Sequence, residues 1–176
     1  MPKNITTKDN YIGFTNLVIS DVIESGFNEF AFEVEKDILR GLLGDETYNE
    51  LISDLDANNL PQTQKFIDLV NGKTYTDNNG DVTLFLGVRK MLTYFVYCVW
   101  KKEDMYSDSD LGTIQTRSSN SIKTSEKIVN RIANARWNIG VDFFNNEVYD
   151  YLLFYQSDFP KWDFISQSKF LTQGII

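Results

Sequence analysis

Residues 84–100, LFLGVRKMLTYFVYCVW, decide the fold, because a nearly continuous apolar stretch of this length indicates a helix buried in a protein core. The chain then becomes polar and rich in Ser and Thr at residues 107–125, SDSDLGTIQTRSSNSIKTS. A second long helix is predicted to begin at Thr124 or Ser125 and to end near Gln156. Two core helices joined by a long polar arm indicate a segment that reaches towards neighbouring molecules.

Shorter helices are predicted upstream of this apolar stretch. Apolar residues recur at helical spacing over residues 28–43 and 45–57, and Gly44 separates the two helices, which we expect to pack as a hairpin. Pro61 fits the first turn of a third, short helix that ends at residues 71–72.

A turn is predicted between the third helix and the central one. Asn79-Gly80 is a strong tight-turn signal, which predicts a small hairpin or a plain loop. Asp77, Asn79 and Asp81 alternate as the ligands of a calcium loop do. However, Gly80 falls at the fourth position of such a loop rather than the sixth, and Val88 occupies the twelfth position in place of Glu. The turn is therefore the favoured interpretation. The central helix is expected from about residue 82 to residue 104.

These patterns predict an all-α fold. It is expected to be a small helical bundle whose two long core helices are joined by an extended polar arm. The predicted division is an N-terminal extended segment at 1–26, a helical domain at 27–156 with its arm at 112–124, and a C-terminal docking tail at 157–176.

The composition excludes several functional classes. The chain of 176 residues has a formal net charge of −8, so tight non-specific binding to nucleic-acid phosphates is not expected of the whole molecule. It contains no His, which removes the commonest general base and the commonest metal ligand. No phosphate-binding glycine motif is present either. We therefore expect no enzyme activity, no catalytic residue, no cofactor and no metal.

The apolar stretch is a poor candidate for a membrane span. It lies near the lower length limit, and Arg89 and Lys90 fall near its middle. The N-terminus lacks the charged and apolar regions of a secretory signal, so we expect a mature, unprocessed start. Cys98 is the single Cys and is expected to be a buried structural thiol rather than a nucleophile.

Three groups of residues could carry contacts or chemistry, and each has two interpretations. Acids near the end of the central helix could hold a cation, although a solvated helix end is favoured: Glu103, Asp104, Asp108 and Asp110. A basic run is either an ordinary polar helix face or a patch for an acidic partner or passing DNA: Arg117, Lys123, Lys127, Arg131 and Arg136. Aromatic residues of the tail either fold back or dock on another subunit, and docking is preferred: Phe159, Trp162, Phe164 and Phe170.

The order of these pieces resembles a known family. The run EKDILRGLLGDETYNEL (35–51), then FIDLVNGKTY (66–75), GVRKMLTYFVYCVW (87–100), DLGTIQTRSSNS (110–121) and the long closing helix is similar to head-tail adaptor, or neck, proteins of tailed bacteriophages. The resemblance is nearest to forms from phages of Bacteroidetes hosts, including the crAss-like group. It covers most of residues 30–155 and consists of packing and turn residues rather than catalytic signatures.

The resemblance implies a structural virion protein, made in the host cytoplasm, that assembles as a ring beneath the portal at the capsid vertex. Such a ring is usually twelvefold; it contacts the portal and adjacent neck or tail proteins, and genomic DNA passes through its channel without specific binding. The arm then contacts a neighbouring subunit through a set of residues between the core helices: Thr113, Ile114, Gln115, Thr116, Arg117, Ile122 and Lys123. The net negative charge suits a channel wall that repels phosphate.

Two other hypotheses stay open on the sequence. A self-contained helical enzyme or regulatory binding domain would use the polar arm as a lid over a pocket with converging acids. A DNA-binding packaging factor would lose affinity steeply with salt, and the net charge counts against it.

Overall fold

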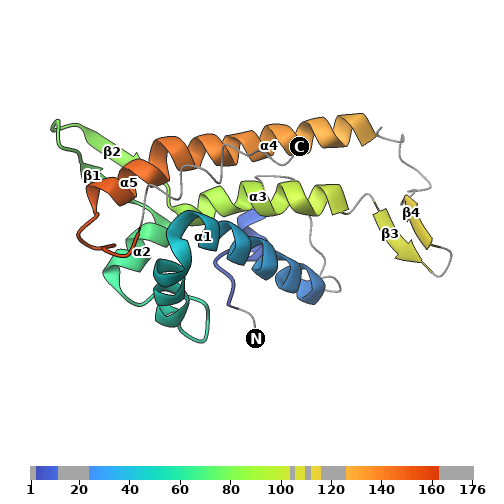
Figure 1. Ribbon diagram of the computed structural model, residues 1–176, viewed down its shortest axis with the longest axis horizontal. Helices are drawn as coiled ribbons and strands as arrows, with labels where there is room; N and C mark the ends of the chain where they lie inside the picture. Colours follow the sequence, from blue (N-terminus) through green and yellow to red (C-terminus); the bar gives the residue numbers. More distant parts are fainter. Residues whose placement is uncertain (1–2, 12–23, 104–105, 110–111, 116–125, 163–176) are drawn as a thin grey trace.

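The computed structural model describes residues 3–11, 24–103, 106–109, 112–115 and 126–162. Its elements are, in chain order, a 3₁₀ turn η1 (Lys8–Tyr11), α1 (Glu24–Asp54), α2 (Gln64–Asn71), β1 (Lys73–Thr76), β2 (Val82–Phe85), α3 (Val88–Glu103), β3 (Tyr106–Ser109), β4 (Gly112–Gln115), α4 (Glu126–Phe143), a π-helical turn η2 (Phe144–Val148) and α5 (Tyr149–Phe154). In Figure 1, α3 lies between α1 and α4, with the β1–β2 hairpin at one end of the molecule.

The prediction of an all-α fold is wrong, because the chain also forms two antiparallel two-stranded sheets, β1–β2 and β3–β4. The Asn79-Gly80 signal did predict the first hairpin. Asp77 closes its loop by accepting hydrogen bonds from the backbone N–H groups of Asn79 and Asp81 at 2.9 Å each, so the turn interpretation of this stretch is confirmed. The fold is therefore mixed, with helices forming most of its core.

The central helix begins later than predicted. It starts at Val88, because Leu84 and Phe85 belong to β2. A short apolar run can form either a strand or a helix, and here Gly87, with φ of 81°, ends the strand. From Val88 onward the prediction of a buried helix is confirmed: Met91, Leu92, Phe95 and Val96 are fully buried, as is the thiol of Cys98.

The helices before the hairpin also differ from the prediction in detail. The two expected helices form one element, α1, with a kink at Gly44, where φ is 75° and ψ is 159°. Pro61 does not open α2; it forms an isolated bridge with Leu55. Instead, the Asp54 carboxylate of α1 fixes the segment before α2, because it accepts hydrogen bonds from the N–H groups of Gln62 and Thr63 at 2.8 and 3.0 Å.

Both described end segments pack into the core of the helical domain. Ile5 and Tyr11 are buried near the N-terminus, and Lys3 donates hydrogen bonds to the carbonyl oxygens of Ile52 and Leu55 at 3.0 and 2.8 Å. The expected N-terminal extended segment is thus partly a 3₁₀ turn held against α1 and α3.

In the parts of the chain that the structure describes, no helix is both long and apolar enough to cross a membrane.

Candidate functional site

The β1–β2 hairpin presents one face to the core and one to solvent. Tyr75 and Phe85 are buried, and the Phe85 ring stacks on Tyr151 with centroids 4.2 Å apart. The alternation of strand side chains then places Val82 and Leu84 outward, where they are 76% and 60% exposed. Solvent-exposed apolar residues gathered on one strand mark a candidate contact surface.

A groove of about 260 Å³ lies between this hairpin and the helical segment that contains η2 and α5. We call it the hairpin groove. Apolar residues from both of its walls include Leu84, Leu153 and Phe154. Three acids also line it: Asp77 from the hairpin loop, Glu147 from η2 and Asp150 from α5. The groove therefore combines apolar walls with negative charge.

Glu147 is a residue of this groove whose carboxylate is only partly hydrogen-bonded. The N–H of Leu86 donates a hydrogen bond to its carboxylate, which ties the end of β2 to the helix. Its second oxygen, Oε2, is buried without a hydrogen-bond partner, and burial raises the pKa of the carboxyl group. The π-helical turn that carries Glu147 is a helix form often found at functional sites. Glu147 therefore adds a largely buried acid to the wall of the hairpin groove.

A second exposed apolar surface follows α4. Its outer face consists of Ile128, Ile132 and Ile139, which are 41%, 44% and 40% exposed. At 100° per residue these three positions lie within about 40° of one another around the helix axis. The opposite side of α4 is buried, and at Gly140 a Cβ atom would lie only 2.9 Å from the Phe95 ring of α3. Thus α4 has two apolar sides, of which one is covered.

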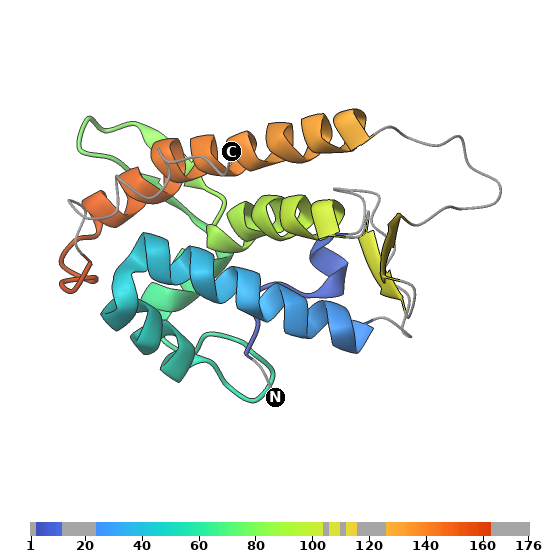
Figure 2. The same ribbon diagram turned by 45° about the vertical axis from the view of Figure 1, so that its right-hand side comes forward.

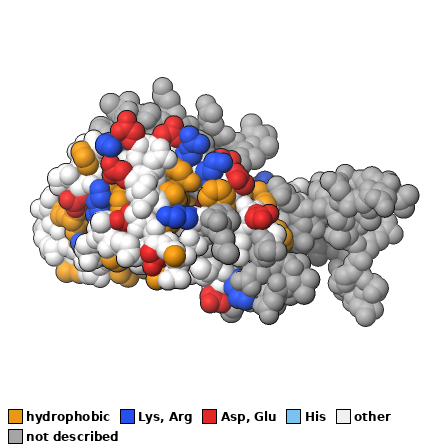
Figure 3. All heavy atoms as spheres, turned by 90° about the horizontal axis from the view of Figure 1, so that it is seen from below, with side chains coloured by type: hydrophobic (Ala, Val, Ile, Leu, Met, Phe, Trp, Pro, Cys, Tyr) orange, Lys and Arg blue, Asp and Glu red, His pale blue; other side chains and the backbone are white. Residues whose placement is uncertain are grey.

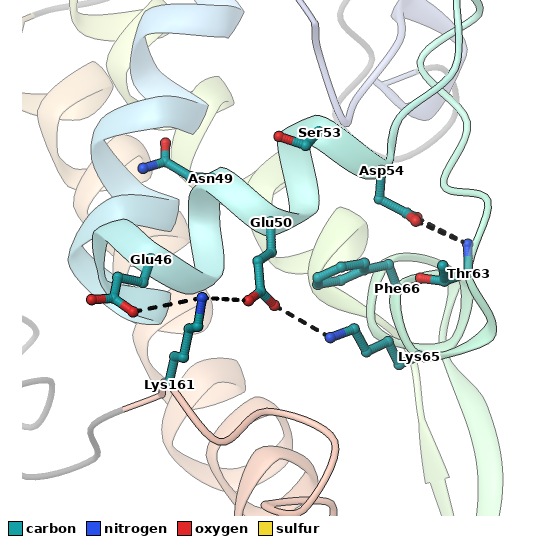
Figure 4. A pocket seen from close by; sticks show the side chains of 9 residues that line it. All are labelled: Glu46, Asn49, Glu50, Ser53, Asp54, Thr63, Lys65, Phe66 and Lys161. Atoms are coloured by element: carbon teal, nitrogen blue, oxygen red, sulfur yellow. Dashed lines mark hydrogen bonds and ion pairs between the residues drawn. The ribbon is translucent and has the colours of Figure 1, made fainter.

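A larger, open pocket of about 650 Å³ is lined by Lys and Glu side chains that form ion pairs with one another (Figure 4). Lys161 contacts Glu50 at 2.9 Å and Glu46 at 3.8 Å, and Glu50 also contacts Lys65 at 3.3 Å. The hydrogen bond from Lys161 contributes most to the lowered pKa of Glu50. These pairs join α1, α2 and the turn before Trp162, so this pocket is a structural junction.

Figure 3 shows acidic and basic side chains interspersed on the face seen from below. The acids of the hairpin groove are instead grouped around a cavity. In the ranges that the structure describes, no group of three or more Cys, Asp or Glu side chains is placed to hold a metal ion. We therefore take the hairpin groove and the outer face of α4 as the candidate functional site.

Some residues of the predicted arm and tail lie in the described part of the chain, and others lie outside it. Thr113, Ile114 and Gln115 lie in β4, whereas Thr116, Arg117, Ile122 and Lys123 lie outside the described residues. Phe159 and Trp162 are 1% and 3% exposed, and the Trp162 indole N–H donates to the carbonyl oxygen of Leu42 at 3.0 Å. For these two residues the structure shows the fold-back alternative. Phe164 and Phe170 lie outside the described residues.

The predicted basic residues Lys127, Arg131 and Arg136 all lie on α4. Arg131 is exposed and stands beside the outer face, whereas Arg136 is partly buried near Tyr94 of α3. Among the candidate acids, Glu103 ends α3 and Asp108 lies in β3, while Asp104 and Asp110 fall outside the described residues.

Sequence reasoning missed the residues that form the candidate site. The signal for the outer face was present, because Ile128, Ile132 and Ile139 form a second apolar stripe on the predicted closing helix. The hairpin groove gave no such signal, since Leu84 was assigned to a buried helix and Glu147 and Asp150 resemble any exposed helix acids.

The comparisons with known proteins give one match. A model of a family of unknown function, DUF6712, matches residues 39–170, a range that contains both the hairpin groove and the outer face of α4. No curated protein and no solved structure matches the chain.

Proposed function

The chain belongs to the DUF6712 family, whose description states no function, and from this premise we propose that it is a structural virion protein of a tailed bacteriophage. In this proposal it forms an oligomeric ring at the portal vertex, connects the capsid and portal to the tail, and lines the channel through which DNA leaves. Its partners are further copies of itself, the portal protein and adjacent neck or tail proteins. The proposal extends the resemblance of residues 30–155 to head-tail adaptors.

The observation that carries this proposal is the β3–β4 ribbon at the start of the predicted arm. The ribbon lies beyond the ends of α3 and α4, at the end of the molecule opposite the β1–β2 hairpin (Figures 1 and 2). Its strands pair antiparallel from Tyr106 with Gln115 to Ser109 with Gly112. A strand pair in this position can contact a neighbouring subunit without disturbing the helical core.

The exposed apolar residues support the same proposal. Val82 and Leu84 on the hairpin, and the isoleucines of the outer face of α4, leave apolar surface in solvent on two separate elements of the fold. Surfaces of this kind are typical of proteins that assemble. The net charge of −8 also suits a channel wall that lets DNA slide past without adhering.

Mass photometry and electron microscopy of the purified protein, alone and mixed with the portal protein of the same phage, test this proposal. We expect a ring, or ring-sized complexes that form on the portal. A virion major capsid protein in place of the portal is the control and is expected to give no complex. A monomer at every concentration, with no association with the portal, would refute the proposal.

A further inference from the structure

We propose that the hairpin groove of one copy receives the outer face of α4 of the next copy, in a head-to-tail contact. This inference deepens the proposed function by naming the two surfaces that would join subunits in the ring, and it rests on that proposal. Its occupant is a second copy of this chain. Both surfaces lie in the described part of the chain: the outer face is on α4, and the groove is beside η2 and α5, which follow α4 in one helical run.

The two surfaces have complementary chemistry. The groove offers apolar contacts from Leu84 and Leu153 together with acids, and the outer face offers Ile132 and its neighbours beside the exposed guanidinium of Arg131. Burying apolar area supplies the driving force for such a contact, and opposite charges fix its register. Neither surface has a partner in the described residues of its own chain that would cover it.

Asp150 gives the contact its charge pairing. It is an exposed acid of the groove lining, whereas Oε2 of Glu147 is buried and is not open to another chain. The guanidinium of a neighbour's Arg131 carries five donors and can pair with the carboxylate of Asp150. The contact thus joins an exposed cation of one subunit to an exposed acid of the next.

The alternative of two identical faces meeting about a twofold axis fits less well. A symmetric contact of the outer faces would place Arg131 near its own copy, and a symmetric contact of the grooves would bring Asp150 and Asp77 near theirs. Like charges oppose both contacts. Because each copy carries one surface of each kind, a head-to-tail contact can repeat around a closed ring.

Cysteine cross-linking tests the contact directly. We expect the double variant Leu84→Cys with Ile132→Cys, oxidised after assembly on the portal, to give a ladder of covalent oligomers on a non-reducing gel. Native Cys98 is buried, and burial raises the pKa of its thiol, so the wild-type protein serves as the background. The matched control is Asn49→Cys with Ile132→Cys, because Asn49 is exposed in α1 and lines the other pocket.

Charge reversal tests the register. Arg131→Glu and Asp150→Arg are each expected to weaken self-association by roughly tenfold, and the double variant is expected to recover most of the loss. Asn58→Glu is the control: it adds a negative charge at an exposed position of the turn after α1, which belongs to neither surface, and self-association should not change.

The outcomes separate this inference from the proposed function. Rings on the portal without a ladder above that of the control would overturn the contact and leave the adaptor proposal standing. Efficient dimers from Ile132→Cys alone would show a symmetric contact and also overturn it. A ladder in solution with no affinity for the portal would support the contact and refute the adaptor role. If no assembly forms with or without the portal, both are wrong.

Discussion

At the scale of single residues, Glu35 of α1 is the buried acid that holds the N-terminal segment. Its carboxylate accepts hydrogen bonds from the N–H groups of Ile5 and Thr6, at 2.6 and 3.0 Å, and from the Thr6 hydroxyl. The Thr6 hydroxyl also contacts the buried Tyr11 hydroxyl. Burial raises the pKa of Glu35 to about 7, although these hydrogen bonds and the charge of Arg89 oppose the shift. Segment 3–11 is thus attached to α1 through a titratable group.

We predict that this group makes stability depend on pH. Because the folded pKa lies above the unfolded value of 4.5, Glu35 contributes stability that is complete below pH 4.5 and is lost as the pH rises through about 7. The shift corresponds to about 3 kcal/mol across that window. Glu35→Gln removes the titration, so in urea unfolding the wild type should exceed the variant by more at pH 5 than at pH 8.

The exposed Glu29→Gln of the same helix is the control, and its free energy of unfolding should follow the wild type at both pH values. Carboxyl groups with lowered pKa, such as Asp45 beside Arg40, titrate identically in all three proteins and cancel in the comparison. An equal difference between wild type and Glu35→Gln at pH 5 and pH 8 would contradict the prediction.

At the scale of elements, two glycines let the hairpin cross the end of α2. Gly72 and Gly87 have φ of 87° and 81°, and each lies against the backbone of the segment that contains the other. A Cβ atom on Gly72 would lie 2.3 Å from the carbonyl oxygen of Phe85, and one on Gly87 would lie 2.4 Å from that of Val70. This close approach places the hairpin, and therefore one wall of the hairpin groove.

We predict that Gly72→Ala and Gly87→Ala each lower the free energy of unfolding by about 3 kcal/mol or more, because a methyl group cannot fit against a backbone carbonyl. Gly80→Ala is the matched control, since Gly80 also has positive φ, 90°, but faces open space. It should cost only about 1 kcal/mol, the strain of the left-handed conformation alone. Equal losses in thermal or urea unfolding for all three would contradict the clash.

The turn that ends at Trp162 is a second element whose role the structure determines. We predict that Trp162→Ala lowers the free energy of unfolding of the monomer by about 3 to 5 kcal/mol, because it empties a buried site and removes the hydrogen bond to Leu42. Lys161→Ala, which removes an exposed side chain from the same turn, should cost less than about 1 kcal/mol. A fully stable Trp162→Ala monomer would restore the docking interpretation of this residue.

At the scale of the whole molecule, the chain combines a buried core with a hairpin at each end, and the proposed ring would use these ends for contacts. The β3–β4 ribbon lies beyond the ends of α3 and α4, and the β1–β2 hairpin lies at the other end (Figure 1). The hairpin groove lies between that hairpin and the η2–α5 segment. Between the two ends, α3 and α4 pack so closely that a Cβ atom at position 140 would lie 2.9 Å from the Phe95 ring. Changes at either end should therefore affect assembly more than folding.

We predict that deletion of residues 113–123 weakens ring assembly by at least roughly tenfold while leaving the helical content nearly unchanged. Replacing the same residues with a Gly/Ser segment of equal length is the control for loop closure, because it keeps the connection and removes only side-chain contacts. Circular dichroism and mass photometry measure the two effects. Intact assembly of the Gly/Ser variant would show that the arm contributes no subunit contact.

The sequence alone located much of the fold. Apolar residues at helical spacing predicted the buried central helix, although the structure begins it at Val88; Asn71-Gly72 predicted the end of α2, Asn79-Gly80 predicted the hairpin turn, and Gly44 marks a kink where the sequence predicted a break between two helices. These are local properties, set by φ preferences and by the periodicity of apolar residues. The absence of His and the net charge are likewise properties of the sequence alone, and they restrict the chemistry open to the chain.

Only the tertiary structure decided which apolar residues are covered. The sequence assigned Leu84 to the core and Trp162 to a partner, and packing reversed both, because burial depends on which elements meet across distant parts of the chain. The hairpin groove exists because β2 lies against η2 and α5, more than fifty residues away in sequence. Local composition fixed the helices and the turn; non-local contacts fixed the exposed surfaces that the proposed ring would use.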